Sequence, residues 1–524
     1  MMGKRIWMIF LLLLPAVRAQ DRSKFPVNDH HIVYHDVRVD AHGGIVPWSG
    51  DGPAEAYDRN IRAIWNFWIH MRKCLNGVPY YLQHQVWKPD ADDERGLGGD
   101  QVNMALDSWN LLYDYLGDPA IPQNMILMAD YWLDHGMSSP TALWANLPFP
   151  YNTDVHSGQY DGDMRAGKGY LQPDKAGSFG AELVMLYKMT GNPRYLDAAI
   201  KIADTLIARV TPGDATHSPW PFRVNATTGE IAEQQVKGER HTAAYTSNWT
   251  PTLRLFRGLE DLHRGHVQEY VRTASLVTSW IKTYPLATNK WGPFFEDIPT
   301  ADYSDTEINA DTMAAYILQQ PDWDPNSVAH ARGILGWSMN RLGNHTFEKL
   351  QVVPINEQTV YLVPGNSHTS RHASVELLYC EKSGDCASRE QAVRRLNWAT
   401  YSVDADGKNR YPNDDIWLTD GYGDYVRHYL RAMASFPELA PSDQDHLLRT
   451  SSVIRHIRYS PAEISYQKFD SRSVERLKLA VSVPKSVEGG TMQWDSSQEV
   501  LTIQAKSRDV TVRLLPRPDG KGSH

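Results

Sequence analysis

The chain has 524 residues, of which 42% are hydrophobic and 22% charged, so it has enough apolar sequence to bury one large core or two ordinary ones. This excludes intrinsic disorder for most of the chain. Lysine and arginine number 53 against 62 aspartates and glutamates, a net charge of −9, which disfavours binding to nucleic acid or to anionic membranes because both need a basic surface. Trp and Tyr, at 17 and 26, outnumber the 12 Phe, so most aromatic rings carry a polar group beside a stacking face.

The N-terminus has the pattern of a secretory signal peptide. Lys4 and Arg5 precede an apolar run, and the small residue Ala19 closes the segment, so we expect residues 1–19 to be removed and the mature protein to be secreted or periplasmic. No later stretch approaches the ~20 apolar residues of a membrane span, so we expect no transmembrane helix. Residues 20–54 read as an extended lead-in.

From Glu55 onward the hydrophobic spacing predicts twelve helices joined by loops. The first, third and later odd members are apolar on one face only, which is typical of an outer layer. The even members are rich in Ala, Gly and Ser, which lets helices pack closely on several sides and favours an inner layer. The odd helices are predicted at 55–76, 122–136, 193–210, 266–283, 326–342 and 388–404, and the even ones at 100–116, 174–190, 249–264, 305–319, 369–381 and 420–434.

Six outer-then-inner pairs over residues 55–440 predict a closed (α/α)6 toroid. An open solenoid of helical hairpins is the competing architecture, but its repeats would be nearly equal in length and sequence, and these are not. The outer-to-inner connections are long and aromatic whereas most inner-to-outer ones are short, so the long connections should form one rim of the ring.

After Pro441 the pattern changes to short, alternating, β-branched segments, and residues 450–516 are predicted to form a small β-sheet or β-sandwich domain. We expect it to pack against the ring rather than to bind sugar. The chain has three cysteines, of which Cys380 and Cys386 could close a short loop as a disulfide or remain free thiols.

Six helical hairpins with one aromatic-rich rim, a small β domain and a secretion signal together resemble the six-hairpin (α/α)6 toroid superfamily of carbohydrate-active enzymes. The resemblance covers roughly residues 55–440 and is architectural, since no family-defining catalytic motif is present. It implies a substrate groove at the rim where the inner helices begin. Members of the superfamily include inverting glycoside hydrolases, unsaturated-uronyl hydrolases, polysaccharide lyases and sugar epimerases, and a shared fold does not choose among them.

The first turns of the even helices and the loops before them should converge on one funnel. Asp100, Asp174, Asp305 and Asp420 all fall where an N-cap is wanted, and a cap stabilises a helix by about 0.5–2 kcal/mol, so each taken singly is more readily a cap than a catalyst. As a set around one axis they predict at least one functional pair. The side chains expected to bind substrate are Asp100, Gln101, Asp174, Lys175, Asn248, Trp249, Glu296, Glu357, Asn366 and Arg371.

Hydrolysis of a glycosidic bond needs one carboxylic acid and one carboxylate. Asp305, Asp420 and Asp424 are the predicted catalytic carboxyls, and Asp420 and Asp424 share a helix face, where mutual repulsion would raise one pKa. A lyase would instead need groups of the type of His368 and Tyr422 to move protons, with Asn366 and Arg371 neutralising a uronate.

The predicted function is therefore cleavage of glycosidic bonds in an oligo- or polysaccharide, with uronate-containing glycans among the substrates considered. Hydrolysis is the first hypothesis because carboxylates dominate the inferred funnel, a lyase is the second and an epimerase the third. A non-catalytic glycan-binding protein is the remaining alternative. The sequence has no phosphate-binding glycine loop, nucleotide fingerprint or metal-ligand spacing, so we expect no cofactor and no metal.

Overall fold

The computed structural model describes residues 35–83, 96–154, 157–236, 238–294, 304–409 and 421–517. The predicted signal peptide lies outside these residues. The side chains of residues 421–423 are likewise outside the description, although their backbone opens a helix.

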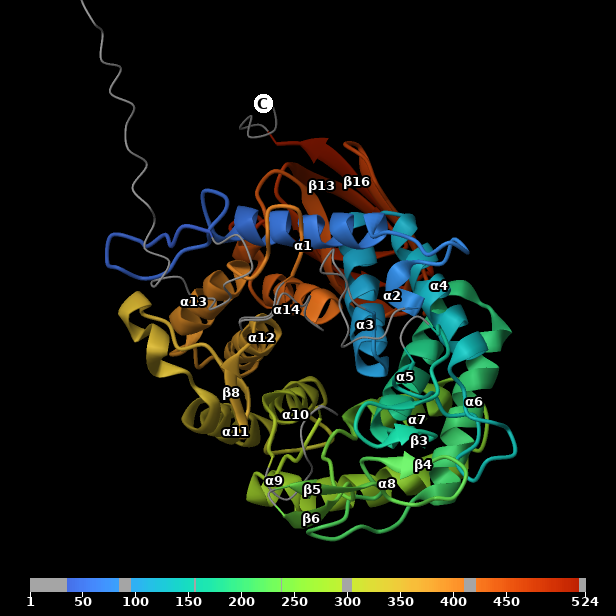
Figure 1. Ribbon diagram of the computed structural model, residues 1–524. Helices are drawn as coiled ribbons and strands as arrows, with labels where there is room; N and C mark the ends of the chain where they lie inside the picture. The colour runs from blue at the N-terminus through green and yellow to red at the C-terminus, as the bar shows by residue number, and fades with distance from the viewer. Residues whose placement is uncertain are drawn as a thin grey trace, which may run out of the picture.

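Two concentric layers of helices form a ring (Figure 1). The fold is the predicted (α/α)6 toroid of six helical hairpins, and each of the twelve predicted helices is present, with most ends within four residues of the prediction and α1 ending six residues earlier, at His70. The ring closes where the first outer helix packs against the last inner one, which in turn packs against the first inner helix. The outer helices are α1 (Pro53–His70), α4 (Ala120–His135), α6 (Pro193–Arg209), α8 (Val267–Thr283), α11 (Ser327–Leu342) and α13 (Arg389–Thr400); the inner ones are α3 (Gly99–Leu116), α5 (Pro173–Thr190), α7 (Thr250–Asp261), α10 (Glu307–Gln319), α12 (Asn366–Ser383) and α14 (Gly421–Ser435).

Side-chain size explains which helices lie inside. Outer helix α1 buries one face, from Tyr57 to Trp68 at helical spacing, whereas inner helix α12 is buried on all sides over its first four turns. Glycines on α5 face α7 closely: a Cβ on Gly177 would stand 1.9 Å from Oγ1 of Thr252, so only glycine permits this approach. Inner helices α3 and α5 end at Gly117 and Gly191 in the left-handed conformation, at φ 68° and 75°.

The C-terminal strands form two four-stranded antiparallel sheets, in the orders β10-β11-β16-β13 and β14-β15-β12-β9. Strand β9 was not predicted, because its buried residues His446, Leu447 and Leu448 are consecutive rather than alternating. The strands are β9 (Asp445–Thr450), β10 (Ile454–Tyr459), β11 (Glu463–Lys468), β12 (Ser473–Leu479), β13 (Ser482–Glu488), β14 (Gly490–Asp495), β15 (Val500–Ala505) and β16 (Asp509–Pro516).

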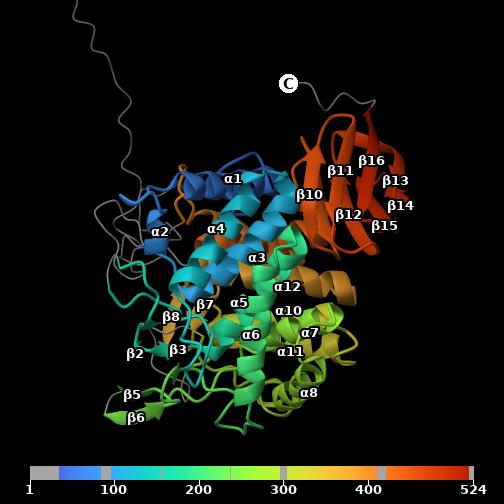
Figure 2. The ribbon, with the colours of Figure 1, turned by 90° about the vertical axis from the view of Figure 1, so that its right-hand side faces the viewer.

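These sheets pack against the C-terminal ends of inner helices (Figure 2). Arg455 Nε donates to the Lys188 carbonyl of α5 at 2.8 Å, and Arg449 forms an ion pair with Glu381 of α12 at 2.6 Å. Short structures in the long connections lie on the opposite side of the ring, where the inner helices begin. They are the helices α2 (Tyr80–Gln83) and α9 (Pro285–Thr288), the 3-10 helix η2 (His345–Leu350) and the hairpin strands β1 (Gly162–Asp163), β2 (Gly167–Lys168), β3 (Tyr170–Leu171), β4 (Val224–Asn225), β5 (Glu233–Val236), β6 (Glu239–Thr242), β7 (Asn356–Gln358) and β8 (Tyr361–Pro364), while η3 (Pro437–Leu439) follows α14.

Residues 35–52 of the lead-in lie along α13 and hold the ring closed. Asn397 donates to the Ile45 carbonyl at 3.1 Å, and the Tyr401 hydroxyl donates to the Val46 carbonyl at 2.9 Å. In the part of the chain that the structure covers, no helix combines the length and apolarity that crossing a bilayer requires.

Cys380 and Cys386 form a disulfide across the C-terminal end of α12, with their Cα atoms 4.6 Å apart, and Cys74 is free. Alkylation of the unfolded, unreduced protein is therefore expected to modify one cysteine, and alkylation after reduction three, as counted by intact mass. In a Cys386→Ser control, two cysteines should react without reduction. Three modified cysteines in the unreduced wild-type protein would show that the disulfide is absent.

Candidate active site

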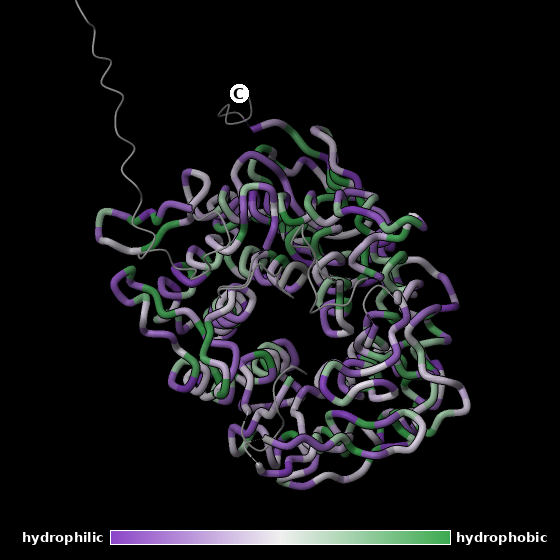
Figure 3. Tube along the Cα trace, viewed as in Figure 1, coloured by the Kyte–Doolittle hydropathy of each residue, from purple (hydrophilic) through white to green (hydrophobic). Residues whose placement is uncertain are grey.

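All six inner helices contribute to one polar cavity at the centre of the ring. It has a volume of about 100 Å³, room for about three water molecules. Its lining residues recur every three or four positions, so one face of each inner helix is turned inward, and Figure 3 shows hydrophilic residues among those bordering the centre. They include Asp100, Asn103 and Asp107 on α3, Lys175 and Glu182 on α5, Arg254 on α7, Asp311 on α10, Arg371 on α12, and Arg427 and Arg431 on α14.

One side of the cavity is built by the first turns of α3 and α5. The Tyr151 hydroxyl donates to Oδ1 of Asp100 at 3.0 Å, and Lys175 Nζ forms an ion pair with Oδ2 of Asp174 at 2.8 Å. Asn248 donates to the same Asp174 oxygen at 2.8 Å. Burial raises the pKa of Asp100, and the nearby Lys175 charge opposes this only in part. This side therefore places a carboxyl whose pKa is raised beside a second carboxyl held in an ion pair.

An apolar collar lies next to these groups. It consists of Met104, Phe294 and Ile308, which form a hydrophobic cluster separate from the main core and all line the cavity. Lys175 Nζ lies 3.4 Å from the centre of the Phe294 ring and donates to the Phe294 carbonyl at 2.9 Å, so the ring is fixed in place. The collar supplies the apolar surface against which the C–H face of a sugar ring packs.

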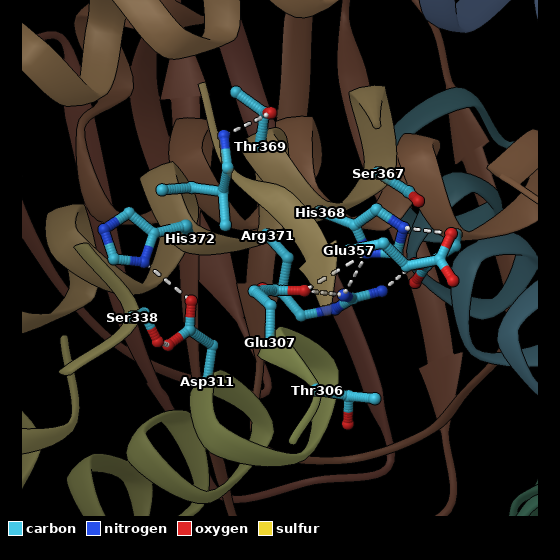
Figure 4. Close-up of polar contacts among 12 residues, drawn as sticks. Thr306, Glu307, Asp311, Ser338, Glu357, Ser367, His368, Thr369, Arg371 and His372 are labelled. Atoms are coloured by element: carbon cyan, nitrogen blue, oxygen red, sulfur yellow. Dashed lines mark hydrogen bonds and ion pairs between the residues drawn. The ribbon is translucent and has the colours of Figure 1, made fainter. Parts of the chain in front are cut away.

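Across the ring from these groups is a chain of buried charges on α10, α12 and α14, of which Arg371 lines the cavity (Figure 4). Arg371 bridges Glu307 and Asp424 with its two terminal nitrogens. His368 Nδ1 lies 3.3 Å from Oε2 of Glu307, and its Nε2 lies 3.6 Å from Oε2 of Glu357 on β7. All five side chains are at most 5% exposed as residues, so the charges are compensated by one another rather than by water.

A second acid–imidazole pair repeats the first one helical turn further along. His372 Nδ1 contacts Oδ2 of Asp311 at 2.7 Å, and the hydroxyl of Ser338 on α11 donates to Oδ1 of Asp311 at 2.7 Å (Figure 4). His372 Nε2 lies 3.6 Å from Oε1 of Glu376. Because Glu307 and Asp311 are four residues apart on α10, and His368 and His372 four apart on α12, the two pairs stack along the helix interface.

These partners set the protonation states. Burial by itself lowers the pKa of His368, but its contacts with Glu307 and Glu357 raise the pKa to about 9, so the imidazole is a cation at neutral pH. Burial raises the pKa of Glu307, opposed by Arg371. Burial also opposes ionisation of Asp424, yet Arg371 and Arg427 hold its pKa well below the ordinary value. His428, at 3.1 Å from Asp424, has its pKa lowered to about 3 by burial.

Unfolding free energy is expected to fall as pH rises from about 6.5 to about 9. Burial by itself lowers the pKa of His372, but Asp311 and Glu376 raise it by more, so the pKa is about 9 in the folded protein against an ordinary 6.5. Its stabilisation is therefore complete below pH 6.5 and is lost as pH passes through 9. Urea denaturation at several pH values measures the slope. His372→Gln should flatten it, the exposed control His345→Gln should not, and equal slopes in all three proteins would contradict the assignment.

At the end of the cavity away from the helix starts, arginines predominate. Oδ2 of Asp107 accepts from Arg427 at 2.8 Å and from Arg431 at 2.5 Å. Arg254 pairs with Glu182 at 3.5 Å, and its side chain is 49% exposed, in contrast to the 3% of Arg371 near the helix starts. Burial raises the pKa of Glu182 to about 7, against the opposing charge of Arg254.

Several predicted site residues have other surroundings. The N-cap residues of α3, α5 and α10 are Gly98, Gln172 and Thr306. The aspartates predicted at these helix starts, Asp100, Asp174 and Asp305, are therefore not the N-caps. Asp305 lies one residue before the cap of α10, and its Oδ1 accepts from the backbone of Trp291 and Gly292 at 2.7 and 2.8 Å, which anchors a loop outside the cavity lining.

Three of the expected substrate-binding residues take structural contacts. Trp249 is fully buried in the main core beside Trp220, with ring centres 4.9 Å apart, and does not line the cavity. Gln101 accepts from the Gly98 backbone at 3.0 Å in a capping box, and Asn366 donates to Asn409. Glu296 and Asp420 lie outside the described residues, and so does the side chain of Tyr422.

The sequence prediction missed the residues deeper in the ring. Glu182, Arg254, Arg427 and Arg431 lie within helices, where charged residues are ordinarily solvated. The signal available was their spacing: Lys175 and Glu182, like Asp100 and Asp107, are seven apart and therefore share a helix face. Among the described residues, no group of three or more His, Cys, Asp or Glu side chains is arranged to hold a metal ion.

Comparison with known proteins shows the fold and no family. No protein-family profile matches the sequence, and no curated protein matches it either. Solved structures do match, at identities that show a shared fold alone. They include a sugar epimerase from a ruminal bacterium (12% identity, 72% of this chain and 97% of that chain, TM-score 0.51), the cellobiose 2-epimerase of Spirochaeta thermophila DSM 6192 (13%, 74% and 97%, 0.53) and a D-mannose isomerase (7%, 74% and 99%, 0.52).

Proposed function

We propose that the protein is a carbohydrate-active enzyme that hydrolyses a glycosidic bond of a sugar held in the central cavity. The observation that carries the proposal is the pair Asp100 and Asp174, two buried carboxyls on neighbouring inner helices in different electrostatic surroundings. One has its pKa raised by burial, and the other forms an ion pair with Lys175. Glycoside hydrolysis requires one proton-bearing carboxyl and one carboxylate.

Asp100 is the proposed general acid. It lines the cavity, burial raises its pKa, and the Tyr151 hydroxyl and the backbone amides of Asp100 and Gln101 hold its carboxyl in place. Asp174 is the proposed base. Lys175 and Asn248 both bind its Oδ2, and its Oδ1 is a buried atom with no hydrogen-bond partner among the described residues; Asp174 itself lies behind the cavity wall, in contact with the lining residues Lys175 and Asn248.

The lyase alternative is less well supported. It assigns proton abstraction to His368, but the contacts with Glu307 and Glu357 raise the pKa of His368 to about 9, which makes it a proton donor at neutral pH. It also assigns uronate neutralisation to Arg371, whose two terminal nitrogens are already bound by Glu307 and Asp424.

Epimerisation is the second candidate. It needs proton-transfer groups on two sides of a sugar carbon. The Asp100 side and the Glu307–His368 side of the ring offer such groups on different inner helices, and the fold is shared with sugar epimerases.

One labelling experiment separates these reactions. The purified protein is incubated with a panel of neutral and acidic oligosaccharides in water enriched in heavy oxygen, and the products are weighed by mass spectrometry. Hydrolysis adds one heavy oxygen to a cleaved product, which is the expected result. A cleaved, unsaturated product without heavy oxygen would identify a lyase. A parallel incubation in deuterium oxide covers the third reaction, because deuterium taken into an uncleaved sugar would identify an epimerase.

We also propose that the enzyme works outside the cytoplasm. The signal-peptide pattern of residues 1–19 supports this, and so does the disulfide between Cys380 and Cys386, because disulfides persist in oxidising compartments.

A further inference from the structure

Three arginines meet at the deep end of the central cavity. Arg254 comes from α7, and Arg427 and Arg431 come from successive turns of α14, and all three line the cavity. Their charges act on one another. Burial lowers the pKa of Arg431, the charge of Asp107 raises it, and the charges of Arg427 and Arg254 lower it again. The helices have therefore brought like charges together rather than kept them apart.

The carboxylates present do not balance this charge. Arg427 and Arg431 share a single oxygen of Asp107. Arg254 faces Glu182 at 3.5 Å, and because burial raises the pKa of Glu182 to about 7, this carboxyl carries only part of a charge at neutral pH. Arg427 also binds Asp424, but Asp424 is shared with Arg371. The deep end thus keeps a surplus of positive charge.

The guanidinium groups also have donors to spare. Each carries five N–H donors in a planar fork that matches a carboxylate or sulfate. In the described part of the chain, the contacts of Arg431 and Arg254 with carboxylates each involve one terminal nitrogen. Nearer the helix starts, Lys175 forms an ion pair with Asp174, and both terminal nitrogens of Arg371 are bound by Glu307 and Asp424.

We propose that the deep end of the cavity, defined by Arg254, Arg427 and Arg431, binds the carboxylate or sulfate group of an acidic sugar. Asp107 follows Asp100 by seven residues on α3, a rise of about 10 Å, so a sugar ring against the Met104–Phe294–Ile308 collar has its charged substituent within reach of the arginines. The inference rests on the proposed function in that it assigns the acidic group to the same substrate.

Calorimetric titration of the full chain with glucuronate and with glucose tests this, because the two sugars differ only in the carboxylate. Glucuronate is expected to bind at least tenfold more tightly than glucose. Arg254→Gln, at a half-exposed position, should remove most of that ratio, as should Arg431→Gln. The matched control is Arg257→Gln, one turn along α7, since Arg257 pairs with Glu260 and Asp261 at the surface and does not line the cavity.

Equal binding of the two sugars by the wild-type protein would overturn the proposal, as would an undiminished ratio in both cavity variants. A third titration with inorganic sulfate distinguishes the source of the anion: sulfate binding as tightly as glucuronate would mean a free-anion site and would overturn the acidic-sugar assignment. Because binding is measured without turnover, selective glucuronate binding in a protein that cleaves nothing would reject the proposed hydrolysis alone.

Discussion

Replacing Asp100 with Asn is expected to lower kcat by about 10²–10⁴-fold, the usual contribution of a general acid. Asn keeps the size of the side chain and still accepts a hydrogen bond from Tyr151, but it has no carboxyl proton to donate, whereas burial raises the pKa of Asp100 and so favours its protonated form. KM should change little. Steady-state kinetics on a substrate found in the labelling screen measures both constants.

A matched control for this variant lies on the same helix. Asp114 is also buried, and burial raises its pKa well above the ordinary value, but it lies near the C-terminal end of α3, outside the cavity lining. Asp114→Asn should therefore leave kcat within about threefold of wild type, because the side chain lies outside the cavity and supplies no catalytic proton. Equal activity losses in the two variants would show that Asp100 acts through stability alone.

Replacing Arg371 with Met is expected to lower the free energy of unfolding by about 3–5 kcal/mol, the cost of breaking a buried ion pair by removing one partner. Arg371, Glu307 and Asp424 are each no more than 3% exposed, so neither carboxylate can turn to water when the guanidinium is gone. Guanidinium denaturation followed by circular dichroism measures the change.

Two further variants make this result specific. Arg332→Met removes a surface ion pair with Asp385 at 2.6 Å and should cost only about 0–1 kcal/mol. Adding Glu307→Gln and Asp424→Asn to Arg371→Met should recover part of the loss, because the uncompensated charges are removed as well. A loss no larger than that of Arg332→Met would mean that the buried network contributes little to stability.

Local pattern was enough to predict the ring. Three local features predicted it: the one-sided apolar spacing of α1, the small residues of the inner helices, and the glycines that end two of them, Gly117 and Gly191. Each feature belongs to a short stretch of sequence, so no knowledge of long-range contacts was needed. Strand β9 was not predicted because its buried residues are consecutive rather than alternating. The convergence of Asp100, Asp174 and Lys175 followed from the ring, since the first turns of inner helices have to meet.

The roles of individual charged residues depended on the assembled molecule. Asp305 and Asp100 are both acidic residues at the start of an inner helix, yet one holds a loop backbone and the other lines the cavity. The arginines of α14 and Arg254 of α7 are 170 or more positions apart in the chain, and nothing local indicates that they share a cavity. Burial and the charge of neighbours decide protonation, and both are set by long-range packing that residue type and spacing do not encode.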